Sequence, residues 1–127
     1  MQAIINIELN ESLMHLESDV ERLGAVMHNV RRFFTRAIGE IRDVEYEGPD
    51  GRVKAKTAVV TFDFHAQKNI VLQAMVQVAR DFNQECIAVL FSDGEGRLVG
   101  PEADRWGGFK IENFKRPAMY ELLREAA

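Results

Sequence analysis

The chain has 127 residues, of which 16 are basic and 20 are acidic, so its formal net charge at pH 7 is −4. This length predicts a single compact domain, residues 1–127, with a core that needs no disulfides or metals. The acidic balance argues against nucleic acid as a partner, because generic polyanion binding requires a basic surface. The single cysteine, Cys86, excludes an internal disulfide framework and a multi-cysteine zinc site.

The start of the chain carries no targeting signal. It has neither a basic segment nor a small-residue cleavage site, and no apolar stretch approaches the ~20 residues of a membrane helix. A free cysteine without a secretion signal is typical of a reducing compartment. We therefore expect a cytoplasmic protein that does not contact membranes.

An N-terminal strand is predicted over residues 2–9, because apolar and polar side chains alternate there. A long helix is predicted next, since apolar residues recur at spacings of three and four from Leu13 to Ile41. Gly39 is its expected stop. Its start is ambiguous, and the candidate caps are Asn10, Ser12 and Ser18, of which Ser18 opens the better capping box.

The apolar stripe of this long helix is wide in its second half and narrow in its first half. A wide stripe suits packing on the chain's own sheet, whereas a narrow stripe also suits one helix of a second protein. An overhanging leucine stripe would promote aggregation unless it were covered. We therefore expect a homo-oligomer, and the residues expected at its interface are Leu13, Leu16, Val20 and Leu23.

The rest of the chain continues the alternation of strands and helices. Turn chemistry at residues 48–51 predicts a hairpin between two strands. The order of elements matches the split βαββαβ pattern, so the predicted fold class is an α+β ferredoxin-like sandwich with two helices on one face of an antiparallel sheet, plus a C-terminal hairpin arm and short helix. The predicted elements are strands 41–46 and 53–64, helix 69–83, strands 86–91 and 97–99, an aromatic loop at 106–109 and a final helix over 117–125.

No catalytic constellation is evident in the sequence. Asp63 and His65 lie two residues apart on a predicted strand and so share a face, where a carboxylate can orient an imidazole as a general base. The pair needs a third partner, and the candidates are Thr61 on the same face and Cys86. No metal-ligand spacing, phosphate loop or nucleophile elbow occurs. We therefore expect no enzyme, no metal and no cofactor.

Basic and aromatic residues suggest a ligand site. Arginines at the end of the predicted helix, together with Lys54 and Lys56 on the hairpin, can form a cationic patch, and guanidinium groups bind phosphates and carboxylates in pairs of hydrogen bonds. A solvated helix end is the alternative. The tail interleaves aromatic and basic residues, as in platforms on which bases stack. The predicted ligand-binding residues are Arg31, Arg32, Arg36, Arg105, Trp106 and Lys110.

Three hypotheses follow from these observations. The first is a non-catalytic binding or regulatory accessory protein, a homo-oligomer that binds a protein partner or a small anionic, nucleotide-like ligand. The second is a small enzyme that uses Asp63 and His65, and the third is nucleic-acid binding through the arginines and the aromatic tail. A single acidic domain without active-site motifs is typical of accessory proteins of viruses and mobile elements.

Overall fold

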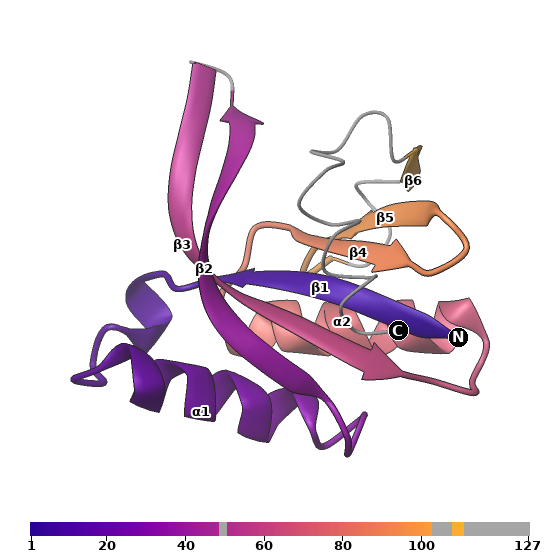
Figure 1. The fold of residues 1–127 in the computed structure, drawn as a ribbon, viewed down its shortest axis with the longest axis horizontal. Helices are drawn as coiled ribbons and strands as arrows, with labels where there is room; N and C mark the ends of the chain where they lie inside the picture. The colour runs from indigo at the N-terminus through magenta and orange to yellow at the C-terminus, as the bar shows by residue number, and fades with distance from the viewer. Residues whose placement is uncertain (49–50, 103–107, 111–127) are drawn as a thin grey trace.

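Two helices cover one face of a six-stranded antiparallel sheet (Figure 1). The structure, a computed structural model, describes residues 1–48, 51–102 and 108–110, and side chains only within 1–44 and 54–102. In chain order the elements are β1 (Gln2–Glu8), η1 (Glu11–Leu13), α1 (Asp19–Val30), β2 (Ile38–Gly48), β3 (Gly51–Asp63), α2 (Lys68–Asp81), β4 (Ile87–Phe91), β5 (Glu95–Val99) and β6 (Gly108–Lys110).

The strand order β2-β3-β1-β4-β5-β6 confirms the predicted fold class. Each helix connects two strands between which a third strand is inserted, which is the split βαβ arrangement of a ferredoxin-like sandwich. β5 and β6 extend the sheet beyond β4. The predicted final helix, 117–125, lies outside the described residues.

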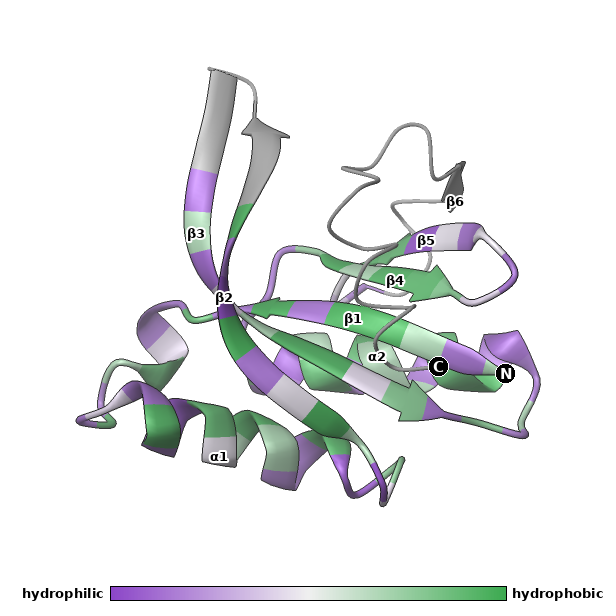
Figure 2. Ribbon diagram, in the orientation of Figure 1, coloured by the Kyte–Doolittle hydropathy of each residue, from purple (hydrophilic) through white to green (hydrophobic). Residues whose placement is uncertain are grey.

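The core lies between the sheet and the helices. Alternate residues of β1 and β3 point toward the helices, and Ile5 and Val60 face each other there without exposure to solvent. Figure 2 shows hydrophobic residues concentrated on the central strands and along parts of both helices. The predicted inner face of β3 is confirmed, since all four of its residues are buried in the core: Ala58, Val60, Phe62 and Phe64. Burial of such apolar surface is the main favourable term in folding. Within the described residues, no helix is long and apolar enough to cross a membrane.

The long helix is shorter than predicted. Ser18 caps α1, and its hydroxyl accepts a hydrogen bond from the Glu21 amide at 3.2 Å. Upstream, Asn10 caps the separate 3-10 turn η1 through the Ser12 amide. Two of the three candidate caps are thus used, each for a different element. The heptad pattern from Leu13 to Ile41 is therefore not one continuous helix. It spans a 3-10 turn, a helix and the start of a strand, which all contact the same core.

Turns follow α1 immediately. The amides of Phe33 and Phe34 both donate to the Val30 carbonyl, which closes the helix. Phe34 then stacks on Phe62 of β3, with ring centroids 4.0 Å apart. The chain is therefore led back onto the sheet, where β2 begins at Ile38. The expected stop at Gly39 is wrong, because the helix ends nine positions earlier and this glycine lies inside β2.

Gly39 has a packing role instead. A Cβ at this position would lie 2.7 Å from the Met27 sulfur, 3.2 Å from Val60 Cγ2 and 3.3 Å from the Val59 carbonyl oxygen. Only a residue without a side chain allows α1 to approach β2 this closely. The glycine thereby sets the distance between the helix and the edge of the sheet.

The β2–β3 hairpin extends past the rest of the sheet. β1 pairs with β3 only from Thr57 to Asp63, whereas β2 pairs with β3 along its whole length. The far part of the hairpin therefore projects from the sheet as a two-stranded arm (Figure 1). β2 also forms one edge of the sheet.

Candidate functional site

A groove of about 590 Å³ lies between α1 and the start of β2. Its size falls in the range of small-molecule sites. A missing side chain widens it on the helix side, because no atom lies within 4 Å of the position where a Cβ of Gly24 would stand. The lining residues are Val20, Leu23, Gly24, Met27, His28, Arg31, Ile38 and Gly39.

The wall of this groove, which we call the α1–β2 groove, is mainly apolar yet open to solvent. Val20 is 81% exposed and Ile38 is 61% exposed, while Met27 is buried at 6%. Large apolar side chains that remain exposed around a hollow mark a binding surface more often than scattered ones do. The groove therefore suits a ligand with a flat apolar part.

Polar groups lie at one end of the groove. His28 is in the last turn of α1 and Arg31 caps the helix. Arg31 Nε donates to the Ala37 carbonyl at 3.1 Å, which fixes the guanidinium beside the start of β2. Among the described residues no carboxylate pairs with Arg31, so its remaining donors can bind a carboxylate or phosphate of a ligand.

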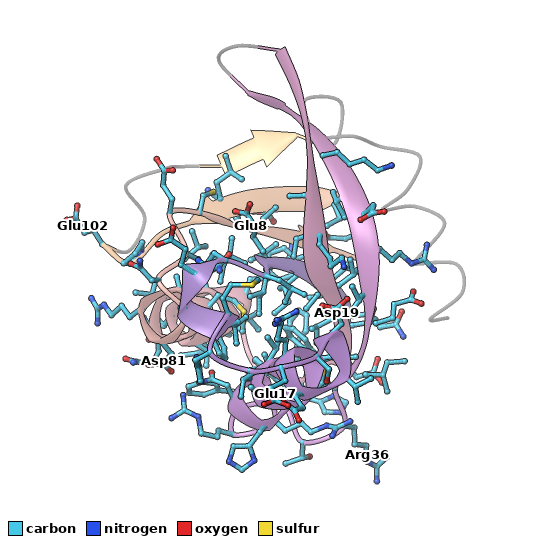
Figure 3. All side chains as sticks on the ribbon, turned by 90° about the vertical axis from the view of Figure 1, so that its left-hand side faces the viewer. Glu8, Glu17, Asp19, Arg36, Asp81 and Glu102 are labelled. Atoms are coloured by element: carbon cyan, nitrogen blue, oxygen red, sulfur yellow. The ribbon has the colours of Figure 1, made fainter. Side chains whose placement is uncertain are left out.

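The predicted arginine patch is divided by the structure. Arg32 Nη2 lies 2.6 Å from Asp81 Oδ2, so it connects α1 to α2. Burial opposes ionisation of Asp81, but hydrogen bonds from Asn29 and Gln77 and the Arg32 charge outweigh it, and the pKa of this carboxyl is lowered. Arg36 projects away from the body of the molecule (Figure 3). Of the three arginines, only Arg31 lines the groove.

The hairpin lysines do not join these arginines. Lys56 Nζ lies 2.9 Å from Asp19, the first residue of α1, whereas the arginines follow the last residue, Val30. At ~1.5 Å per residue the two ends of this helix are ~17 Å apart. The expectation of one cationic patch with Lys54 and Lys56 is therefore wrong.

The tail residues of the predicted ligand site are not tested. Arg105 and Trp106 lie outside the described residues. Lys110 is paired with Glu95 in the register of β5 and β6, and its side chain lies outside the described part. Binding of a small ligand by Arg105, Trp106 and Lys110 stays a prediction.

The structure does not gather the four expected interface residues on one surface. Leu13 is 1% exposed and belongs to the core, and Leu16 and Leu23 pack against the same core. Val20 is 81% exposed, and Leu16 and Leu23 are half-buried. The reason is that α1 begins after Leu16, so the four residues never share one helical stripe. Leu13 is therefore not available to a second copy, and self-association through Leu16, Val20 and Leu23 remains a prediction.

The candidate catalytic pair is exposed and isolated from the cysteine. Asp63 and His65 are both exposed, and Asp63 pairs with Gln2 at the start of β1. Cys86 precedes β4, which runs antiparallel to β1, so the cysteine lies toward the other end of that strand. Burial, with a smaller effect of the Glu85 charge, raises the pKa of the Cys86 thiol to about 11. Cys86 is thus a poor nucleophile, and it is not near the pair.

Sequence reasoning missed a charged cluster at the start of α2. Lys68 Nζ lies 2.5 Å from Glu95, also contacts Asp93, and stands over the Phe91 ring at 5.0 Å. Hydrogen bonds to Asp93 and Glu95 raise the pKa of Lys68, and the same bonds lower the pKa of both carboxyls. The cluster ties α2 to the β4–β5 turn. No local signal marks it, because the partners lie 25 and 27 residues from Lys68.

A second polar cluster closes the far end of α2. The buried Gln84 side chain donates to the Glu8 carbonyl and accepts from the Glu8 amide, both at 2.9 Å. Asn10 and Ser12 also donate to the Phe82 carbonyl, at 3.0 and 2.9 Å. These side chains complete the hydrogen bonding of the backbone at the end of β1 and of the last carbonyls of α2. The described residues contain no group of three or more acidic, histidine or cysteine side chains suited to hold a metal.

Comparison with known proteins shows a likeness of structure. No protein-family model and no curated protein matches the sequence. A phage SAM lyase solved in complex with S-methyl-5′-thioadenosine matches at a TM-score of 0.50 and 15% identity, over 76% of this chain and 78% of that chain. A phage SAM lyase in the apo state matches at a TM-score of 0.49 and 16% identity, with the same coverage. The likeness to the complex shows that the two chains share a fold.

This likeness corrects the first functional hypothesis. We expected a non-catalytic binding or regulatory protein because the sequence holds no recognisable catalytic motif. The chain shares its fold with an enzyme, a phage SAM lyase, so the missing motif is no sign of a missing activity. The expectation that the protein is not an enzyme is therefore wrong.

Proposed function

We propose that this protein is an enzyme that cleaves S-adenosylmethionine and releases S-methyl-5′-thioadenosine. The observation that carries the proposal is the fold it shares with a phage SAM lyase over about three quarters of both chains, 76% and 78%. Because fold alone does not determine chemistry, the proposal also rests on the α1–β2 groove. The phage source of that lyase supports a viral origin for this chain as well.

The groove offers complementary groups for such a ligand. The adenine ring is flat, and its face would lie against Val20, Leu23 and Met27. The amino-acid carboxylate would bind the Arg31 guanidinium, whose Nε is already held by the Ala37 carbonyl. The substrate is a cation overall, and a chain with net charge −4 favours its approach.

The apolar wall also favours the bond cleavage. Breaking the bond between sulfur and the amino-acid carbon returns its electron pair to sulfur, so the sulfonium becomes a neutral thioether. The positive charge of the bound substrate is less well solvated against apolar side chains than in water. Because this charge decreases toward the transition state, the apolar wall lowers the free energy of the transition state relative to that of the bound substrate. A lyase adds no water, so the remaining fragment closes on its own carboxylate or loses a proton. A guanidinium that orients the carboxylate would control the first of these outcomes.

Product analysis tests the proposal. Purified protein incubated with S-adenosylmethionine should form S-methyl-5′-thioadenosine, measured by liquid chromatography and mass spectrometry, while a heat-denatured sample should not. Arg31→Gln should lower the rate at subsaturating substrate by roughly 10- to 100-fold, since it removes a charge-assisted contact. Arg36→Gln, which removes an exposed arginine outside the groove, is the matched control and should leave the rate unchanged. Absence of product together with absence of ligand binding would contradict the proposal.

A further inference from the structure

Among the described strands, β2 forms an outer edge of the sheet and pairs only with β3 (Figure 1). Its backbone groups on the other side are available to pair with an added strand. Ile38, at the start of this edge, is 61% exposed. The edge thus combines unpaired backbone with an uncovered apolar side chain.

Charges along this edge restrict what can be added. In β2, side chains alternate between the two faces, so Ile38, Glu40, Arg42 and Val44 share the face opposite to that of Ile41. Glu40 and Arg42 form an ion pair within the chain at 2.6 Å. Charged residues on an edge strand discourage pairing in any register that brings like charges together.

One register turns these charges into complementary pairs. Two copies of β2 related by a twofold axis run antiparallel, and each residue of one copy faces its counterpart across the axis. When the axis passes at Ile41, Glu40 of each copy faces Arg42 of the other, and the exposed Ile38 faces Val44. When the axis passes at Glu40 or at Arg42, two like charges meet instead. The sequence of the edge therefore selects a single self-complementary register among its neighbours.

We infer that β2 is a self-association surface, through which a second copy of this chain extends the sheet in the register centred on Ile41. The partner is a second copy and not an unrelated strand, because the charge order of β2 complements itself. The interface buries Ile38 and converts the Glu40–Arg42 pair within one chain into two pairs between chains. The interface shares Ile38 with the α1–β2 groove, but the charged residues that set its register, Glu40 and Arg42, do not line that groove.

Charge reversal with recombination tests this inference. Sedimentation velocity over a wide concentration series should show the wild-type chain at the mass of two copies. Glu40→Arg alone and Arg42→Glu alone should each weaken association by roughly tenfold or more, because each places like charges in both cross-chain pairs. An equal mixture of the two variants should associate again, since arginine then faces glutamate at every pair.

Recombination distinguishes an effect between chains from an effect within one. Each variant chain carries two like charges at positions 40 and 42, so mixing cannot restore the internal ion pair. Glu85→Arg and Arg80→Glu make the same charge changes at exposed positions outside β2 and should leave association unchanged. A wild-type chain that stays at single-copy mass, single variants that associate as well as wild type, or a mixture that stays dissociated would each overturn the inference.

Discussion

At the scale of single residues, the two described glycines near the groove have opposite roles. Gly39 permits close approach of Met27 and Val60, whereas Gly24 lies in the middle of α1 with open space around it. Replacement of glycine by alanine should therefore change the free energy of unfolding in opposite directions at the two positions.

Gly39→Ala should lower the free energy of unfolding by about 1–3 kcal/mol, because an added methyl group overpacks against the Val60 side chain and the Val59 carbonyl, and the Met27 side chain can give way only in part. Gly24→Ala is the matched control and should raise it by about 0.5–1 kcal/mol, since alanine is the better helix former. Urea denaturation with a constant m-value checks both. Equal effects at the two sites would show that the packing of Gly39 is not limiting.

Gln84 is the buried polar residue whose loss should cost most. It is 3% exposed, and its amide completes the hydrogen bonding of Glu8. Gln84→Ala leaves a donor and an acceptor of the backbone unsatisfied, so the free energy of unfolding should fall by about 2–4 kcal/mol. Thermal denaturation followed by circular dichroism measures the change. Gln73→Ala, at an exposed position of α2, is the control and should have almost no effect.

At the scale of elements, ion pairs connect segments that are distant in sequence. Lys68 ties α2 to the β4–β5 turn, Lys56 ties β3 to α1, and Arg32 ties α1 to α2. Partly exposed pairs of this kind contribute modestly, and their contribution depends on pH. The Lys68 cluster is the clearest case because one lysine serves two carboxyls.

At acidic pH the Lys68 cluster should no longer contribute to the free energy of unfolding. The pKa values of Asp93 and Glu95 are lowered from their ordinary values of 3.8 and 4.5 by hydrogen bonds to Lys68. A carboxyl whose pKa is lowered in the fold stabilises the fold at any pH above its ordinary pKa. This stabilisation is lost as the pH falls through the lowered pKa. Lys68→Met should therefore destabilise the protein at pH 7 by about 1 kcal/mol, after allowance for solvent screening, and the difference from wild type should shrink below pH 4.5. Urea titrations at several pH values measure this difference, and a gap that stays constant with pH would contradict the assignment.

At the scale of the whole molecule, the fold positions the α1–β2 groove beside the unpaired edge of the sheet. α1 supplies one wall and β2 the other, and Gly39 sets their separation. A ligand bound there contacts two elements that would otherwise separate on unfolding. Binding should consequently stabilise the whole domain.

Ligand stabilisation can be measured without turnover. S-methyl-5′-thioadenosine at about 100 times its Kd should stabilise the fold by about 2.7 kcal/mol and raise the Tm by roughly 10 °C. Differential scanning fluorimetry over a ligand series checks this, and methionine, which lacks the adenine ring, is the matched control ligand. A Tm that does not change with ligand concentration would show that the groove does not bind this class of molecule.

The sequence by itself determined the fold class, most elements and most of the core. Alternation in β1 and β3 and the three-four spacing in α2 depend on local side-chain order, which is why these elements were predicted within a few residues. The Ser18 cap is equally local. Asp63 and His65 are exposed as expected, but His65 lies beyond the end of β3.

Only the tertiary structure decided where α1 ends and which residues form the site. The apolar period from Leu13 to Ile41 does not distinguish one helix from a turn, a helix and a strand on the same core, because burial imposes the pattern in each case. The α1–β2 groove joins residues of two elements, and the Gln84 and Lys68 clusters join residues far apart in the chain. Such contacts depend on the packing of helices on the sheet, which no local spacing encodes.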